Sequence, residues 1–345
     1  MKKYFEEVDS LSVKKIEVIL SSEKPKVIYD GNELRKYDCI YAKGSFKYAA
    51  ILRSITEAKY DQAYMPLRPA AFTIGHNKLL THLKMQKVGV PMPQTYVTSS
   101  IAASKKVLQE MNYPVVMKFP SGTQGKGVMF ADSFSSASSL LDALEALKQP
   151  LIIQEYIETE GTDIRALVIG DKVAAAYYRK AVKGEKRSNI HAGGQGIKVE
   201  IDNKTKKIAV MAAKALGCDI CGVDILIGPK GPLVIEVNLS PGLQGITQTT
   251  KIDVAAMIAE FLYNKTKERN ESKNENPSEK VFADLNIKAA DKQKKEIKSA
   301  IDHIKVRADK IVLPSFVTKI CEFDDDDEVE ITAEKGYVCV KDIKK

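Results

Sequence analysis

Apolar and polar positions alternate through the middle of the chain in a way that predicts mixed strands and helices. The short apolar runs "PVVMKFP" and "PLIIQEYI" are typical of strands, and "SASSLLDALEALK" between them has helical spacing. Two further pairs of apolar runs are separated by "GDK" and "PKG", so each pair predicts a β-hairpin. These pairs are "DIRALVIG" with "KVAAAYYRKA" and "CGVDILIG" with "PLVIEVNLS". Hairpins packed by helices predict an α/β or α+β fold.

Residues 1–75 predict a smaller α/β unit that precedes this region. "KKIEVILS" and "YDCIYAKG" predict strands, and "SFKYAAILRSITEA" predicts an amphipathic helix. "YMPLRPAAFTIGHNK" contains two prolines and is interpreted as a loop that leads into the helix "NKLLTHLKMQKVG". Further helices are predicted in "KTKKIAVMAAKALG" and "IDVAAMIAEFLYN".

The pattern changes after residue 263. Residues 264–280 are polar and nearly free of apolar side chains, which indicates a linker or a solvated helix extension. Residues 281–345 form an extension of unknown role, with a helix predicted from the spacing of Ile297, Ile301, Ile304 and Ala308 and a β-like tail in "EVEITAEKGYVCVKD". The four aspartates before this tail favour a solvated turn over a metal site, because like charges repel and neighbours cannot easily converge on one ion.

Composition narrows the class of protein. A chain of 345 residues predicts two or three domains, and its net charge of +8 favours a lysine-rich surface over a nucleic-acid partner. Five scattered cysteines predict no disulfide framework, and Cys221 is interpreted as a core residue. The N-terminus has no apolar signal core and no run approaches the ~20 residues that span a bilayer, so a cytoplasmic protein is expected.

The glycine loop in "KFPSGTQGKGVMF" joins two predicted strands and carries two lysines, Lys118 and Lys126. It fits neither the Walker A motif nor the dinucleotide fingerprint, because Lys126 is followed by glycine and a strand. Backbone N–H groups of a β-loop-β flap can still lie over phosphates, since glycine lets the backbone come close. Taken alone, a plain hairpin is equally consistent with this pattern.

A set of oxygen-bearing side chains strengthens the nucleotide hypothesis. Glu236 and Asn238 are two apart on one predicted strand and therefore share a face, and Asp224 can face them from the neighbouring strand. Oxygen ligands of this kind suit Mg²⁺ held together with nucleotide phosphates. The alternative is a salt-bridged edge strand, which is disfavoured because no basic residue alternates with these positions in the two strands.

A basic cluster follows in the same region. It comprises Arg165 beside Asp163, Arg179, and the segment with Arg187, Ser188, Asn189 and His191. Arginine forks and amide donors near a metal site suit phosphate or carboxylate groups. Taken singly, each residue is also consistent with an ordinary surface position, and His191 is interpreted as a loop residue.

Six ordered motifs together resemble the ATP-grasp ligases, specifically the RimK-like α-L-glutamate ligases. They are "KFPSGTQGKGV", "QEYI", "DIRALVIG", "RSNIHAGG", "GVDIL" and "GPLVIEVNLSPGLQGITQTTKIDVAAMI". The resemblance spans roughly residues 40–262. It implies an ATP-grasp fold with a pre-ATP-grasp domain at 1–75 and an ATP-grasp domain at 76–263, whose lid lobe covers about 95–155. Cys221 stands where a small residue such as alanine is expected.

The resemblance also implies roles for individual residues. Asp224, Glu236 and Asn238 would hold Mg²⁺, two ions in the usual case, with Mn²⁺ as a substitute. Arg165, Arg179, Arg187 and Asn189 would act on the reacting groups, and "NLSPGLQGI" would close the acceptor side. The ATP contacts would come from Lys78, Lys118, Gly122, Thr123, Gln124, Gly125, Gly127, Glu155, Tyr156, Asp163, Arg187, Ser188 and Asn189.

The implied reaction joins a carboxylate to an amine at the expense of ATP. An acyl phosphate forms first, and the α-amino group of an amino acid, glutamate by this resemblance, then displaces phosphate. The acceptor would be a carboxylate on a protein tail or a cofactor, with no membrane or nucleic-acid partner, and many relatives are homo-oligomers. Three alternatives stay open: another amino acid, an ATP-binding regulatory protein without turnover, and, more distantly, a nucleic-acid-binding module.

Overall fold

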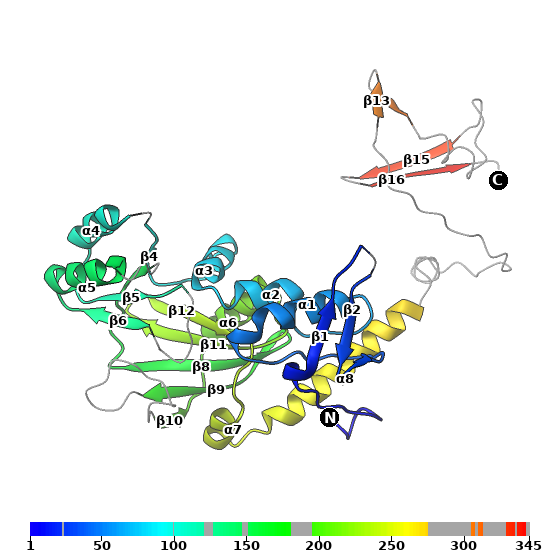
Figure 1. Ribbon diagram of the computed structural model, residues 1–345, viewed down its shortest axis with the longest axis horizontal. Coiled ribbons are helices and arrows are strands. Elements are labelled where there is room, and N and C mark those ends of the chain that lie inside the picture. The colour runs from blue at the N-terminus through cyan, green and yellow to red at the C-terminus, as the bar shows by residue number, and fades with distance from the viewer. Residues whose placement is uncertain are drawn as a thin grey trace. The chain divides into compact units, whose positions relative to one another are not determined.

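The structure of the protein is a computed structural model. It describes residues 1–22, 24–98, 100–120, 127–146, 151–180 and 195–274, together with four short C-terminal strands. The chain divides into two compact units, Met1–Asn276 and Pro277–Lys345, which are treated separately. Figure 1 shows the elements of both units.

The N-terminal part of the first unit pairs a small sheet with a helix. The antiparallel strands β1 (Ile16–Ile19), β2 (Lys26–Tyr29) and β3 (Asn32–Glu33) follow the short 3-10 helix η1 (Val13–Lys15). After η2 (Phe46–Tyr48), helix α1 (Ala49–Lys59) buries Ile55 against Val27 and Leu34. The strand predicted in "YDCIYAKG" is wrong, because only Cys39 forms a bridge, with Tyr64, while Tyr41 packs into the core.

The segment between this part and the next contains two helices. The predicted loop at 64–78 is partly wrong, since α2 (Pro69–Ile74) forms within it, with Pro69 in the first turn where its missing N–H costs nothing. Helix α3 (Lys78–Lys87) is confirmed. Its N-cap is Asn77, whose side chain accepts a hydrogen bond from the Leu80 N–H.

A four-stranded antiparallel sheet forms the next lobe, in the order β4-β7-β5-β6. Helices α4 (Ile101–Glu110) and α5 (Phe134–Ala146) pack with it around Leu108, Met117 and Leu141. Sequence analysis predicted α5 but not α4. The strands are β4 (Thr95–Tyr96), β5 (Val115–Lys118), β6 (Val128–Ala131) and β7 (Ile152–Glu155).

The larger sheet of the first unit has five antiparallel strands in the order β10-β9-β8-β11-β12. Both predicted hairpins are confirmed, as β8 with β9 and as β11 with β12. Helix α6 (Asn203–Leu216) covers one face, and α7 (Gln244–Thr250) and α8 (Val254–Asn274) pack against the other. The strands are β8 (Thr162–Ile169), β9 (Lys172–Lys180), β10 (Gln195–Lys198), β11 (Ile220–Gly228) and β12 (Gly231–Asn238).

Helix α8 continues to Asn274, through the first part of the polar stretch that begins at residue 264. In the second unit, the predicted β tail is confirmed as the hairpin of β15 (Val329–Glu334) and β16 (Tyr337–Asp342). The helix predicted around 297–308 lies largely outside the described residues, and Lys305–Arg307 forms strand β13, paired with β14 (Lys310–Val312).

Candidate active site

Charged side chains form a row across the five-stranded sheet, on the face opposite α6. Arg165 on β8 stands directly opposite Asp224 on β11, and Asp224 stands directly opposite Glu236 on β12. Asp163 and Arg179 face each other across β8 and β9. Residues at i and i+2 of a strand share a face, so the antiparallel register brings these predicted site residues together.

Two arginines hold the carboxylates of this row. Arg165 donates through Nε and Nη2 to the two oxygens of Asp224, each at 2.6 Å. Arg179 makes the same two-pronged contact with Asp163, also at 2.6 Å, and its Nη2 lies 2.8 Å from Asp224 Oδ2. Burial alone would raise the pKa of Asp224, but the charges of Arg165 and Arg179 lower it to about 2. The acid is therefore ionised at neutral pH.

The sequence argument against a salt bridge at Asp224 was wrong. It considered only the two strands of one hairpin, whereas the cationic partners stand on the neighbouring strands β8 and β9. The Asn238 amide also donates to Asp224 Oδ2, at 3.3 Å. A carboxylate has about four lone-pair sites. Three of the four contacts fall on Oδ2 and one on Oδ1, so Oδ2 can bind a cation only if a donor moves, whereas Oδ1 keeps a lone-pair site.

Glu236 is the second carboxylate of the predicted metal set, and its surroundings differ from those of Asp224. Burial and the charge of Asp224 raise its pKa, while Lys78, Arg165 and Lys118 act in the opposite direction. Within the described residues, no three His, Cys, Asp or Glu side chains are placed to hold a metal ion by themselves. Two carboxylates and one amide oxygen still fit Mg²⁺, which is usually bound through one or two carboxylates plus substrate phosphates.

Two lysines on different elements, Lys118 of the four-stranded lobe and Lys78 of α3, place positive charge near Glu236. Lys118 ends β5, and burial of its ammonium lowers its pKa to about 8, with Glu236 opposing the shift. Lys78 opens α3, and its backbone N–H donates to the Pro120 carbonyl at 2.9 Å, which fixes the helix end beside the strand. Cations from β5 and from α3 thus lie near the carboxylates of the larger sheet, as a site for a polyanion and a metal requires.

Lys118 also marks the base of the predicted flap. β5 and β6 pair in antiparallel register, with Lys118 opposite Val128. Gly127 has φ of +78°, and a Cβ there would lie 2.3 Å from the Phe119 ring, so this position requires glycine. Gly122, Thr123, Gln124 and Gly125 lie outside the described residues, as do Arg187, Ser188 and Asn189.

The predicted adenine hinge lies at the end of β7. Glu155 Oε1 accepts from the Gln94 N–H at 2.8 Å, while the Glu155 N–H donates to the Gln94 carbonyl at 2.9 Å. Tyr156 packs edge-on against Phe130 of β6, with ring centroids 6.0 Å apart. The segment is therefore fixed on both sides. In this arrangement both oxygens of Asp163, predicted to reach the ribose, accept from Arg179.

Comparison with known proteins agrees with this geometry. A family model for the RimK-like ATP-grasp domain matches residues 75–262. A probable α-L-glutamate ligase of Vibrio cholerae is 40% identical over 249 residues, which cover 70% of this chain and 82% of the relative. Its Vibrio vulnificus counterpart is 36% identical over 276 residues, 78% of this chain and 89% of the relative.

The chain belongs to the RimK-like ATP-grasp family. It is an ATP-grasp ligase, a class of enzyme that forms carbon–nitrogen bonds. Solved structures agree on the fold: the ATP-grasp ligase PsnB, in complex with a minimal precursor, Mg and ADP, has a TM-score of 0.57 at 19% identity, covering 74% of this chain and 86% of that one. A RimK domain protein from Sphaerobacter thermophilus has a TM-score of 0.52 at 19% identity, covering 66% and 82%.

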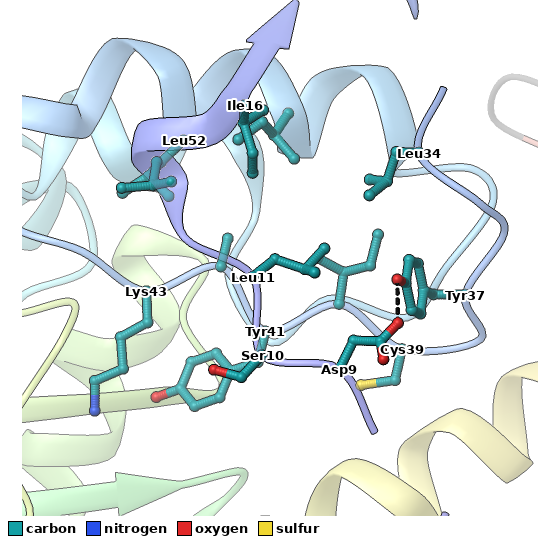
Figure 2. Close-up of a pocket in the computed structure, with 14 residues that line it drawn as sticks. Asp9, Ser10, Leu11, Ile16, Leu34, Tyr37, Cys39, Tyr41, Lys43 and Leu52 are labelled. Carbon is teal, nitrogen blue, oxygen red and sulfur yellow. Dashed lines mark hydrogen bonds between the residues drawn. The ribbon is translucent and has the colours of Figure 1, made fainter. Parts of the chain in front are cut away.

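A pocket of about 340 Å³ lies in the N-terminal part of this ATP-grasp ligase, between Asp9 and Ile55. Apolar side chains including Leu11 and Leu52 line it, and Figure 2 shows Lys43 and Tyr41 at one end, pointing the same way. Lys43 Nζ donates to the Pro241 carbonyl at 2.9 Å. The N-terminal part therefore holds the segment that follows Asn238.

Sequence analysis missed three residues of this ligase: Gln154, which accepts a hydrogen bond from Lys118, and His82 and Thr95, which bond to Gln154. Gln154 was quoted only as part of the hinge motif, and His82 was hidden in the periodicity of α3. No spacing rule could have joined them, since they stand on three different elements.

In the part of the chain that the structure describes, no helix combines the length and apolar character needed to cross a bilayer.

Proposed function

We propose that the protein activates a carboxylate as an acyl phosphate with ATP and Mg²⁺ and joins it to the α-amino group of L-glutamate. The observation that carries this proposal is the row from Arg165 through Asp224 to Glu236, with the positive charges of Lys78 on α3 and Lys118 on β5 near Glu236. Such a pairing of cations and carboxylates suits a triphosphate with its metal, and it needs no covalent nucleophile.

The reaction proceeds in two displacements. An oxygen of the acceptor carboxylate attacks the γ-phosphorus of ATP, the bond to the β-phosphate oxygen breaks, and ADP leaves with that electron pair. The amine then attacks the acyl carbon, phosphate leaves, and the amine loses a proton. Asp224, Glu236 and Asn238 would hold Mg²⁺. When bound, the metal would neutralise charge on the phosphates.

The chain's own residues position and neutralise the reacting groups. Lys78 and Lys118 would bind the phosphates, and the predicted glycine flap that follows Lys118 in the sequence would exclude water from them. Arg165 and Arg179, freed from one of their carboxylate contacts, would bind the acyl phosphate or the substrate carboxylate. The roles of Glu155 and Tyr156 at the adenine, and of Arg187, Ser188 and Asn189 beside the triphosphate, belong to the same proposal.

The relatives support glutamate, because those with 36–40% identity are named probable α-L-glutamate ligases. The acceptor is proposed to be a carboxylate on a protein tail or a cofactor. Peptide acceptors gain support from PsnB and from the macrocyclase MdnC, whose solved structures contain precursor peptides; MdnC has a TM-score of 0.53 at 16% identity. We place the reaction in the cytoplasm, with Mg²⁺ as the metal and two ions per site.

The test is ADP release by the purified full chain with ATP, Mg²⁺ and an acceptor from each class, compared across all twenty amino acids. We expect L-glutamate to give the fastest release, and mass spectrometry to find one glutamyl residue added to the acceptor. Faster release with lysine or aspartate would replace glutamate by that amino acid. ATP binding without ADP release under every condition would favour a regulatory protein.

A further inference from the structure

Lys118 lies at the end of a buried chain of hydrogen bonds that starts at the backbone of Lys78. His82 Nδ1 lies 2.6 Å from the Lys78 carbonyl oxygen, and His82 Nε2 lies 3.2 Å from Gln154 Nε2. Gln154 Oε1 accepts from Lys118 Nζ at 2.6 Å. Gln154 is only 2% exposed and His82 8%, so these groups interact with each other rather than with bulk water.

The chemistry of the end groups decides which atom donates at each step. The Lys78 carbonyl can only accept, so His82 Nδ1 carries the proton. In a neutral imidazole Nε2 then accepts, and it receives an N–H of Gln154. The Lys118 ammonium can only donate, so the Gln154 oxygen must face it.

Thr95 fixes the same amide from a second side. Its hydroxyl donates to the Pro93 carbonyl at 2.9 Å, and its oxygen accepts the other N–H of Gln154 at 2.8 Å. Both amide protons and the amide oxygen of Gln154 are thus used. Reversing the amide would place N–H groups against the Lys118 ammonium and an oxygen against the lone pair of His82 Nε2.

Protonated His82 does not fit this chain, because its Nε2 would then carry a proton that faces the Gln154 N–H. The charged groups near the ring are Lys78 on its own helix and Lys118 on β5. Burial and the charges of both lysines lower the pKa of His82. The hydrogen bond to the Lys78 carbonyl raises it, but the net shift is downward. The neutral ring with its proton on Nδ1 is the form that the geometry accepts.

We propose that His82 and Gln154 are positioning residues for Lys118, and that this relay keeps the ammonium charged and aimed at the site. The proposal rests on the function proposed above, in which Lys118 binds an ATP phosphate. Gln154 supplies an acceptor that stabilises the charged lysine in a buried place, and His82 fixes which end of the amide faces it. The relay also ties the first turn of α3 to the end of β5.

The test is the pH dependence of binding of a non-hydrolysable ATP analogue with Mg²⁺, measured by calorimetry on the full chain. Wild-type affinity should fall as the pH rises through about 8, where Lys118 loses its proton. We define the midpoint as the pH at which half of this loss of affinity has occurred. In Gln154→Leu the charged lysine loses an acceptor, so this midpoint should move down by about one pH unit. In Gln154→Glu a carboxylate faces the lysine, and the midpoint should move up.

Gln86→Leu makes the same chemical change at an exposed position of α3 and should leave the midpoint where it is. A purely structural role would weaken binding equally at every pH and leave all the midpoints together, which would overturn the proposal. Gln154→Glu is nearly isosteric with the natural residue, so its midpoint tests the proposal even where Gln154→Leu does not fold.

Nitrogen-15 spectra of the imidazoles test the relay without nucleotide. The His82 signal, identified by its loss in His82→Gln, should show a protonated Nδ1 and a bare Nε2 at pH 7.5. In Gln154→Glu the ring should be protonated on both nitrogens. A wild-type His82 with its proton on Nε2 would overturn the relay, whereas wild-type protein that binds no ATP analogue would overturn the proposed function instead.

Discussion

Arg165 and Asp224 stand directly opposite each other on neighbouring strands, and both arginine contacts to the carboxylate measure 2.6 Å. Arg179 and Asn238 also donate to Asp224 Oδ2, so this oxygen has no lone-pair site left for a cation. The arginine that would bind the acyl phosphate therefore occupies a proposed metal ligand. Binding of a metal at Oδ2 requires that a donor such as the arginine is released, so the two events are coupled at this oxygen.

Replacing Arg165 should affect metal binding and turnover in opposite directions. In Arg165→Met we expect Mg²⁺ or Mn²⁺ to bind more tightly in the absence of nucleotide, because a competing cation is gone. ADP release should fall about 100-fold or more, since the same arginine would stabilise charge in the transition state. Calorimetric metal titration and steady-state kinetics measure the two effects.

Arg53→Met is the matched control for this substitution. Arg53 lies on α1 and is about half exposed; it donates to Thr73 Oγ1 at 2.9 Å and lies 4.0 Å from Glu57, away from the carboxylate row. Neither metal affinity nor turnover should change in it. If Arg165→Met weakens metal binding instead, the arginine does not compete for Asp224, and the coupling described above is absent.

The two lysines of the flap should not be equivalent. Lys118→Ala should abolish ATP-dependent turnover, because Lys118 is fixed at the base of the flap, while Lys126→Ala should reduce it less. Since burial lowers the pKa of Lys118 to about 8, the wild-type kcat/KM for ATP should decline above that pH. Equal losses in the two variants would count against the flap.

Adding a methyl group at the base of the flap should weaken ATP binding. Gly127→Ala forces a side chain into a positive φ and against the Phe119 ring, so we expect KM for ATP to rise about ten-fold. Gly31→Ala is the control, since Gly31 also has a positive φ but no atom within 4 Å of the added carbon. It should lower stability slightly and leave KM unchanged; a similar KM in both variants would show that the base of the flap tolerates the change.

The position of a C-terminal truncation should decide whether the first unit stays stable. Arg269 on α8 donates to the backbone carbonyls of Tyr60, Asp61 and Gln62, at 2.8–3.3 Å, beyond the end of α1. A chain ending at residue 276 keeps these bonds, whereas one ending at 264 loses them. We expect the shorter chain to unfold at a temperature lower by about 5 °C or more in calorimetry. Equal unfolding temperatures would show that the last turns of α8 contribute nothing.

The sequence predicted the parts of the fold that depend on local pattern. Alternating β-branched runs with short polar breaks identified both hairpins of the larger sheet, and the two-residue spacing of Glu236 and Asn238 placed them on one face. Cys221 is fully buried, as predicted. Helix α2 was missed because prolines were interpreted as loop residues, although proline is favoured in a first helical turn.

Strand order and register could not be predicted from spacing alone. Arg165 and Arg179 reach Asp224 only because β8 and β9 lie beside β11 in the sheet, and nothing local in "DIRALVIG" indicates that neighbour. The relay of His82 and Gln154 depends on a helix and a strand more than 70 residues apart in sequence. Side chains that position others across elements are the part of the site that required the structure.

The most direct measurement of the central claim is ADP release by wild-type protein and by Asp224→Ala, with ATP, Mg²⁺, L-glutamate and each acceptor class. We predict that the wild type releases ADP over many turnovers only when both glutamate and an acceptor carboxylate are present, and that Asp224→Ala releases none. ATP binding without ADP release in the wild type, unchanged by Asp224→Ala, would contradict the account.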